Sequence, residues 1–178
     1  KPWAGLDDEA PDLDERLGKV LTLRTLLETV ADYDQRVELA IETKHPTRYA
    51  GLVERRLAEL LRDFGWHRAG APVRVMSFSF TALQRMQRLT PDLTLVMLIE
   101  KKRAWPLLQP VISDDWCLGP GIELLEEHPR FARRLAAAGH DLHVWTVNTA
   151  AQLETCLELG VKAVISDRPG YIMGLLDR

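Results

Sequence analysis

The segment LTLVMLI, residues 93–99, is apolar at every position except Thr94. A strand with one face in water alternates apolar and polar residues, whereas a strand of a parallel sheet is covered by helices on both faces. The unbroken apolar run therefore predicts a strand buried on both sides. It favours a parallel sheet flanked by helices, which is the arrangement of α/β proteins.

The segments before and after residues 93–99 alternate in the same way between strand and helix. The predicted strands are 37–43, 73–78, 93–99, 110–113, 141–148 and 161–167, and LGPG at 118–121 is predicted as a turn. The predicted helices are 22–30, 48–64, 81–89, 123–139 with a break near Pro129, 150–160 and 169–176. This alternation indicates a series of βαβ units.

Two parallel architectures are compatible with this pattern: an open doubly wound sheet and a TIM (β/α)₈ barrel. A TIM barrel usually needs ~250 residues, whereas this chain has 178 residues, begins with a predicted helix and contains about six predicted strands. The simplest reconciliation is a TIM barrel without its first one or two β/α units, although composition alone leaves the choice open. We expect one domain over residues 1–178, with an irregular acidic lead-in at residues 1–20.

The amino-acid composition limits the classes of molecule that the protein is expected to bind. A hydrophobic fraction of 46%, a net charge of −3 and a pI near 6.0 are ordinary for a globular protein and indicate no basic surface for nucleic acid. No apolar run approaches the ~20 residues of a membrane span. Cys117 and Cys156 lack metal-site spacing and are predicted to be free thiols. We expect a cytoplasmic protein, and a homo-oligomer is compatible with the sequence.

The predicted strand at 37–43 ends in charged residues. Because side chains alternate between the two faces of a strand, Glu42 and Lys44 share the face of Ala40, and Thr43 lies on the other face. TIM barrels carry their active sites at the carboxyl ends of the strands. A carboxylate there suits a Ca²⁺ or Mg²⁺ ion, and a lysine suits a phosphate group. A solvated ion pair at the strand exit is the other interpretation, and His45 reads as a loop histidine.

Polar and aromatic residues also stand at other strand ends. Ser77 and Phe78 end the strand at 73–78, and Trp145 in VWTVN is suited to line a pocket or to pack in the core. Asp167, shortly before Pro169, has the position of a helix start. The chain has no Gly-rich phosphate loop, no Gly-x-Ser-x-Gly elbow and no His-Glu-x-x-His motif. The absence of the Gly-rich loop argues against nucleotide binding.

Five segments, taken together and in order, resemble the glycerophosphodiester phosphodiesterase family: LTLRTLLE, LAIETK, VMSFSFTALQRM, HVWTVN and GVKAVISDRPG. Each motif is short, but their order over about residues 20–170 makes the joint match specific. The resemblance implies a TIM barrel that hydrolyses small glycerophosphodiesters to an alcohol and glycerol 3-phosphate. It also implies a divalent cation, commonly Ca²⁺ or Mg²⁺.

The resemblance also implies roles for individual residues. Glu42 is similar to a metal-ligand carboxylate, and Lys44 to the lysine that contacts the phosphate. Trp145 is similar to the aromatic residue that lines the glycerol pocket, and Ser77 and Phe78 to a pair of residues near the site. Thr43 replaces the aliphatic residue that is usual at its position in the family. Because its side chain lies on the face opposite to the site, we expect this difference to have little effect on the chemistry.

Three elements of the family are not found in this chain: a His-Arg-Gly strand, a Glu-x-Asp strand and a His-Asp pair. In the family they supply the two acid–base histidines and the remaining metal carboxylates. We therefore expect no general acid or base within this chain, and no hydrolysis by the chain alone. The alternatives are a related phospholipid phosphodiesterase that forms a cyclic phosphate, and a barrel that binds phosphoesters without catalysis.

Overall fold

The computed structural model describes residues 20–33, 37–44 and 51–177. Most of the predicted lead-in, and His45, lie outside these residues. The chain divides into two compact units, residues 1–35 and 36–178. The first contains α1 (Leu23–Ala31), whose N-cap Thr22 accepts a hydrogen bond from the backbone N–H of Thr25 at 3.2 Å. The helix predicted at 22–30 and its cap are thus confirmed.

The described part of the second unit alternates strand and helix, as the sequence predicts. Its strands are β1 (Leu39–Glu42), β2 (Val73–Ser77), β3 (Thr94–Ile99), β4 (Cys117–Pro120), β5 (His143–Val144) and β6 (Ala163–Val164). Its helices are α2 (Leu52–Asp63), α3 (Phe80–Leu89), η1 (Lys102–Ala104), α4 (Trp105–Leu108), α5 (Ile122–Glu127), α6 (Pro129–Ala136), α7 (Ala150–Glu158) and α8 (Pro169–Leu176). None of the described helices is long and apolar enough to cross a membrane.

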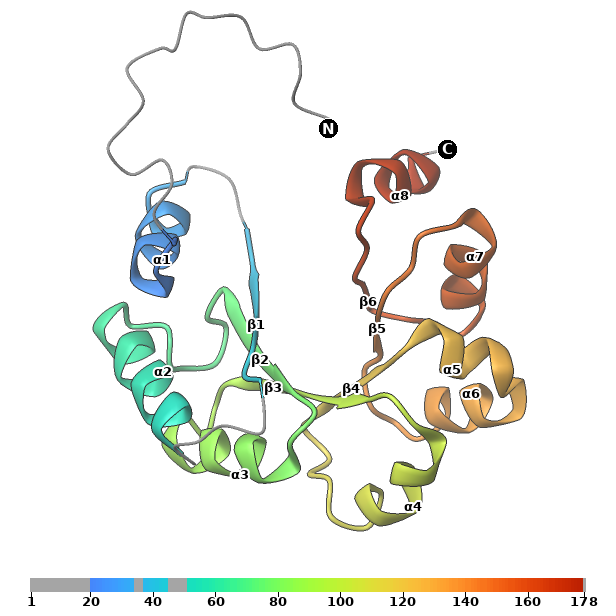
Figure 1. The fold of residues 1–178 in the computed structure, drawn as a ribbon, viewed down its shortest axis with the longest axis horizontal. Coiled ribbons are helices and arrows are strands. Elements are labelled where there is room, and N and C mark those ends of the chain that lie inside the picture. The colour runs from blue at the N-terminus through green and yellow to red at the C-terminus, as the bar shows by residue number, and fades with distance from the viewer. Residues whose placement is uncertain (1–19, 34–36, 45–50, 178) are drawn as a thin grey trace, which may run out of the picture. The chain divides into compact units, whose positions relative to one another are not determined.

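All described strand pairs are parallel and follow the order of the chain (Figure 1). Strands β1 to β4 form one sheet, β5 pairs with β6, and the bridges Leu118–Leu142 and Gly121–Trp145 join β4 to the β5 segment. Within the described residues, β1 and β6 each have one neighbouring strand, and no pairing closes the sheet into a full circle. The expected α/β class with a parallel sheet is confirmed.

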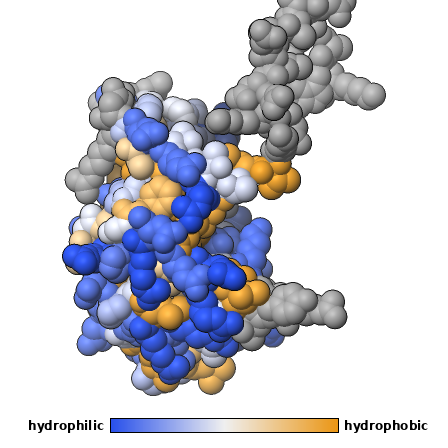
Figure 2. Space-filling view, turned by 90° about the vertical axis from the view of Figure 1, so that its left-hand side faces the viewer, coloured by the Kyte–Doolittle hydropathy of each residue, from blue (hydrophilic) through white to orange (hydrophobic). Residues whose placement is uncertain are grey.

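The strand register divides the side chains between two faces. On the inner face, Met76, Val96, Leu98 and Cys117 form a buried cluster, against which Trp145 and Ile165 pack. Residues of opposite parity, such as Val75 and Leu95, are buried on the outer face, where helices cover the sheet. Burial on both faces explains why residues 93–99 are continuously apolar. The outer surface of the helices is polar, and the side view in Figure 2 is mainly hydrophilic with smaller apolar areas.

Two predictions around residues 110–121 are wrong. Residues 110–113 are not a strand but follow α4, and the predicted turn at 118–121 is instead the end of β4 and the start of α5. Glycine and proline usually indicate turns, but here Gly119 is required by packing. A Cβ at Gly119 would lie 2.6 Å from Leu98 Cδ2 and 3.1 Å from Val96 Cγ1. Pro120 ends the strand, and its carbonyl accepts the Trp145 N–H at 3.3 Å.

The remaining helices and strands are of the type predicted from the sequence, but some of them differ from the prediction in length. The helix break at Pro129 is confirmed, since α5 ends at Glu127 and α6 begins at Pro129. Strands β5 and β6 each span two residues, shorter than the predicted 141–148 and 161–167. Cys117 and Cys156 are both buried free thiols, as expected.

Candidate active site

Glu42 and Lys44 lie where β1 ends, at the carboxyl edge of the sheet. Both side chains are exposed, whereas Thr43 between them is only 2% exposed. Glu42 pairs in register with Met76 of the inner cluster, so the acidic side chain lies on the inner face of the sheet. The alternation predicted from the sequence is confirmed. A carboxylate and an ammonium thus share one face at the edge where parallel α/β proteins bind their ligands.

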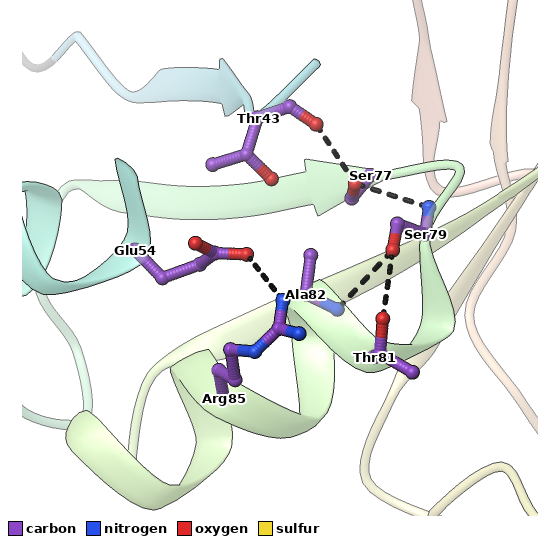
Figure 3. A network of polar contacts seen from close by, with 7 residues as sticks. All are labelled: Thr43, Glu54, Ser77, Ser79, Thr81, Ala82 and Arg85. Carbon is purple, nitrogen blue, oxygen red and sulfur yellow. Dashed lines mark hydrogen bonds and ion pairs between the residues drawn. The ribbon is translucent and has the colours of Figure 1, made fainter. Parts of the chain in front are cut away.

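Ser77, the last residue of β2, does not face the inner side of the sheet. Its side chain instead contacts the backbone just after β1 (Figure 3). Its side chain is fully buried, and its Oγ donates to the carbonyl of Thr43 at 2.8 Å. The backbone N–H of Ser79 donates in turn to Ser77 Oγ at 3.1 Å. Because the accepting carbonyl belongs to the residue between Glu42 and Lys44, Ser77 fixes the backbone that carries both charges.

The hydrogen-bond chain continues into the helices behind the strands. Ser79 is the N-cap of α3, and its Oγ accepts from the N–H of Ala82 at 3.3 Å. Below it, Arg85 of α3 donates to the buried carboxylate of Glu54 on α2 at 3.2 Å (Figure 3). These contacts join α2 and α3 beneath the carboxyl ends of β1 and β2. These contacts therefore hold in place the end of β1, which carries Glu42 and Lys44.

Trp145 and Phe78 form an aromatic pair at the same edge. Their ring centroids are 5.5 Å apart in an edge-to-face arrangement, and the indole N–H of Trp145 donates to the carbonyl of Gly119 at 2.7 Å. A Cβ at Gly121 would lie 3.3 Å from the indole, so the ring fits closely over this glycine. Trp145 packs against the inner core with one part and remains partly exposed with the other. The two sequence interpretations, core and pocket wall, are therefore compatible.

A network that the sequence reasoning missed joins the exits of β5 and β6. The Asn148 side-chain oxygen accepts from Ser166 Oγ at 3.1 Å and from the N–H of Asp167 at 3.0 Å, and its amide donates to the Asp167 carboxylate at 2.9 Å. Asp167 is not the cap predicted from its position, since Arg168 is the N-cap of α8. The available signal was Asn148, three residues after the aromatic Trp145, because the exits of neighbouring parallel strands lie close together.

None of the described histidines directly follows the carboxyl end of a strand, although His128 lines a pocket with Glu100 and Lys101, which follow β3. His143 is the first residue of β5, is 3% exposed, and has its ring Nε2 3.3 Å from Arg74 Nη1. Burial, and then the charge of Arg74, lowers the pKa of His143 below its ordinary value. His67, His128 and His140 do not directly follow a strand either. Within residues 20–33, 37–44 and 51–177, no described contact joins a histidine to Glu42, and no cluster of metal-ligating groups brings them together.

The described residues also supply only part of a metal site. No group of three or more His, Cys, Asp or Glu side chains among them could hold a metal ion. Glu42 offers one hard oxygen ligand at the exposed strand end, which suits Ca²⁺ or Mg²⁺.

A family model for the "Glycerophosphoryl diester phosphodiesterase family" matches residues 6–171. The chain belongs to this family. Among its curated relatives, a "Probable glycerophosphodiester phosphodiesterase 1" of Mycobacterium tuberculosis is 33% identical over 175 residues, which are 96% of this chain and 64% of the relative. The "Glycerophosphodiester phosphodiesterase" of Bacillus subtilis is 28% identical over 153 residues, or 84% of this chain and 52% of the relative.

Solved structures of the family share the fold. A glycerophosphodiester phosphodiesterase from Parabacteroides distasonis has a TM-score of 0.69 and 17% identity, covering 87% of this chain and 63% of that one. An Oleispira antarctica phosphodiesterase in complex with the product sn-glycerol-3-phosphate has a TM-score of 0.67 and 22% identity, covering 88% and 61%. These neighbours are TIM barrels, which confirms the predicted fold class. The chain spans 64% of the length of the mycobacterial relative.

Proposed function

We propose that the protein containing this chain hydrolyses glycerophosphodiesters to an alcohol and glycerol 3-phosphate. The observation that carries the proposal is the pair Glu42, exposed on the inner face at the end of β1, and Lys44, exposed two residues further along the chain. Membership of the family supports the reaction class. The product held by the Oleispira relative, sn-glycerol-3-phosphate, agrees with the expected product.

The described residues bind and orient the substrate in this proposal. The ammonium of Lys44 contacts a non-bridging phosphate oxygen, where a point charge stabilises negative charge as it develops. The glycerol lies against Trp145 and Phe78, whose carbon-rich faces suit a small polyol. Ser77 has no direct contact with the substrate; its hydrogen bond to the Thr43 carbonyl keeps Glu42 and Lys44 on the inner face.

A divalent cation fits this arrangement in part. Glu42 would hold one coordination position, and Ca²⁺ and Mg²⁺ are the candidates for its hard oxygen ligand. When bound, such an ion supplies charge stabilisation to the phosphoryl oxygens. The other ligands are not assembled among the described residues, so Glu42 alone is assigned to the metal.

The bond changes balance with water as the only co-reactant. The oxygen of water, or first that of the glycerol 2-hydroxyl, attacks phosphorus, and the bond from phosphorus to the leaving alcohol oxygen breaks. The nucleophile loses a proton and the leaving alkoxide gains one, which requires a general base and a general acid. The described strand ends offer no histidine for either step. We therefore propose that these groups lie outside the described residues, and that residues 20–33, 37–44 and 51–177 do not by themselves supply the acid and base.

Replacing Glu42 tests the proposal in the protein as its gene encodes it. Glu42→Gln keeps the shape of the side chain and removes its charge, and we expect kcat/KM for glycerophosphocholine to fall by roughly 10²-fold or more. Release of glycerol 3-phosphate is measured by coupling it to its dehydrogenase, with Mg²⁺ and Ca²⁺ titrated separately.

The matched control is Glu59→Gln on the outer surface of α2, where Glu59 pairs with Arg56 at 2.8 Å. It should retain wild-type turnover, because exposed pairs contribute little. Wild-type turnover by Glu42→Gln would remove the metal role of Glu42. A cyclic phosphate as the final product, in place of glycerol 3-phosphate, would show that the protein is a lyase and not a hydrolase.

The cytoplasmic location remains a prediction, which fractionation of cells would test.

A further inference from the structure

A polar hollow of about 400 Å³ lies between η1 and the first turns of α6, and none of its lining residues belongs to the candidate active site. The size falls within the ~300–1,000 Å³ range of small-molecule sites. A neighbouring hollow of about 370 Å³ shares Lys102, Glu127 and His128 with it. In that smaller hollow Lys101 already lies 3.7 Å from Glu100. The larger hollow is therefore the one whose charges are available to a ligand.

Cationic side chains predominate in the larger hollow, which we call the cationic hollow. Lys102 of η1 and Arg130 and Arg133 of α6 line it, and Glu127 is the one carboxylate among its described lining residues. Within the described part of the chain, none of the three cations makes a hydrogen bond or ion pair through its side chain. The whole chain has a net charge of −3. A local positive excess thus stands against an acidic overall balance.

Buried aromatic packing fixes the two segments that carry these cations. Trp105, which directly follows η1, packs edge-to-face on Phe131 of α6, with ring centroids 6.3 Å apart. Trp105 is 6% and Phe131 is 4% exposed, so both rings belong to the core. Arg130 precedes Phe131 in the sequence, and Lys102 stands three residues before Trp105. The backbones on both sides of the hollow are therefore held in place, and only the cationic side chains need to become ordered when a ligand binds.

The number and kind of these charges suit a phosphate group with two negative charges. Arg130 and Arg133 are three residues apart on α6, so their side chains leave the same face of the helix. Guanidinium groups bind phosphate oxygens through paired hydrogen bonds, and a lysine adds a point charge. Three cations against one carboxylate leave an excess of two positive charges. A phosphate monoester carries about −1.5 to −2 at pH 7, whereas a phosphodiester carries a single negative charge.

We propose that the cationic hollow binds a doubly charged phosphate group, at a site separate from the one that cleaves the substrate. Two sources supply this group: inorganic phosphate, and a small organic phosphomonoester such as glycerol 3-phosphate, the product of the proposed function. Both present the same three charged oxygens to Lys102, Arg130 and Arg133. The site itself stands without the proposed function, and only the second source rests on it.

The test measures phosphate binding to the protein as its gene encodes it, with Lys44→Gln in every sample to remove the proposed phosphate contact of the active site. Radiolabelled inorganic phosphate and glycerol 3-phosphate are dialysed separately against the protein without divalent metal. We expect about one equivalent per chain, with an affinity that falls as NaCl is added. Unlabelled dimethyl phosphate, which carries one charge, should compete much more weakly than unlabelled inorganic phosphate.

Neighbouring arginines of α6 provide matched variants. Arg130 and Arg133 line the hollow, whereas Arg134 is equally an exposed residue of α6 and does not line it. The double variant Arg130→Gln/Arg133→Gln should weaken binding by roughly 10-fold or more, because it removes two charged hydrogen-bond donors. Arg134→Gln should keep the affinity of the parent, although it also removes one positive charge from the same helix.

The outcomes separate this inference from the proposed function. Unchanged phosphate affinity in Arg130→Gln/Arg133→Gln, or no binding in the parent, overturns the site even in a protein that hydrolyses glycerophosphocholine. Equal competition by dimethyl phosphate overturns the preference for two charges. Binding that depends on the two arginines, in a protein with wild-type Lys44 that does not hydrolyse glycerophosphocholine, keeps the site and overturns the proposed function. The more tightly bound of the two labelled compounds identifies the source of the phosphate group.

Discussion

Thr43 lies between the two proposed functional charges and contributes through its backbone. Its N–H donates to the Met76 carbonyl at 2.9 Å, and its carbonyl accepts from Ser77 at 2.8 Å. Its buried hydroxyl has no hydrogen-bond partner among the described residues. A buried hydroxyl without a partner costs free energy. The family's usual aliphatic residue at this position would avoid that cost.

We therefore expect Thr43→Val to raise the free energy of unfolding by about 1 kcal/mol, since valine has nearly the same shape. Thr90→Val is the contrasting variant, because the buried Thr90 hydroxyl donates to the Met86 carbonyl at 2.9 Å. It should lower the free energy by about 1 kcal/mol. Urea unfolding of both variants checks the pair. A similar loss in both would mean that the Thr43 hydroxyl is satisfied.

At the scale of elements, β4 is the strand that depends most on one small residue. Gly119 lies against the side chains of Leu98 and Val96 of β3, which leave no room for a methyl group. Leu98 is itself 4% exposed and part of the inner cluster, so it cannot move freely.

Gly119→Ala should accordingly lower the free energy of unfolding by about 1–3 kcal/mol through overpacking. Gly174→Ala in α8 is the control, because nothing lies within 4 Å of a Cβ at that position. Alanine is favoured over glycine in helices, so this variant should match or exceed the wild type by up to ~1 kcal/mol. Thermal and urea unfolding compare the two; tolerance of Gly119→Ala would show that β3 and β4 can separate slightly.

The same strand shows how far the sequence could predict the fold. Strands β1, β2 and β3 were predictable because apolar runs and helical stripes alternate clearly there. Strand β4 was not, because Gly119 and Pro120 carry a turn signal, and the contact that requires the glycine joins residues far apart in sequence. Likewise, Glu42 and Lys44 followed from alternation along one strand. The Asn148–Asp167 network depends on which strands are neighbours, which local patterns do not specify.

At the scale of the whole sheet, a polar cluster of which only His143 is buried links three segments across the inner face. Arg74 of β2 contacts Glu38, which precedes β1, and His143 of β5. Burial and the charge of Arg74 lower the pKa of His143, while Asp141 and Glu38 oppose this shift. His143 therefore binds a proton less readily in the folded state than in the unfolded chain.

The protein should consequently lose stability as the pH falls below the ordinary histidine pKa of ~6.5, by at most about 1.4 kcal/mol per pH unit until the folded-state pKa is reached. His143→Asn should flatten this part of the dependence, and His128→Asn, at the α5–α6 junction, should keep it. Urea midpoints at about pH 7 and about pH 5 provide the measurement. Parallel curves for wild type and His143→Asn would refute the lowered pKa of His143.

The strand order has a consequence for how the molecule is made. Among the described residues, each strand from β2 to β6 is paired with, or for β5 bridged to, the strand before it, so none of these waits for a partner synthesised much later. Translation delivers ~5–20 residues per second, so each new strand–helix unit leaves the ribosome within seconds of the unit it pairs with. The sheet can grow in the direction of synthesis, each new strand being added next to the one made just before it. We expect the nascent chain to assemble in the order in which it is read.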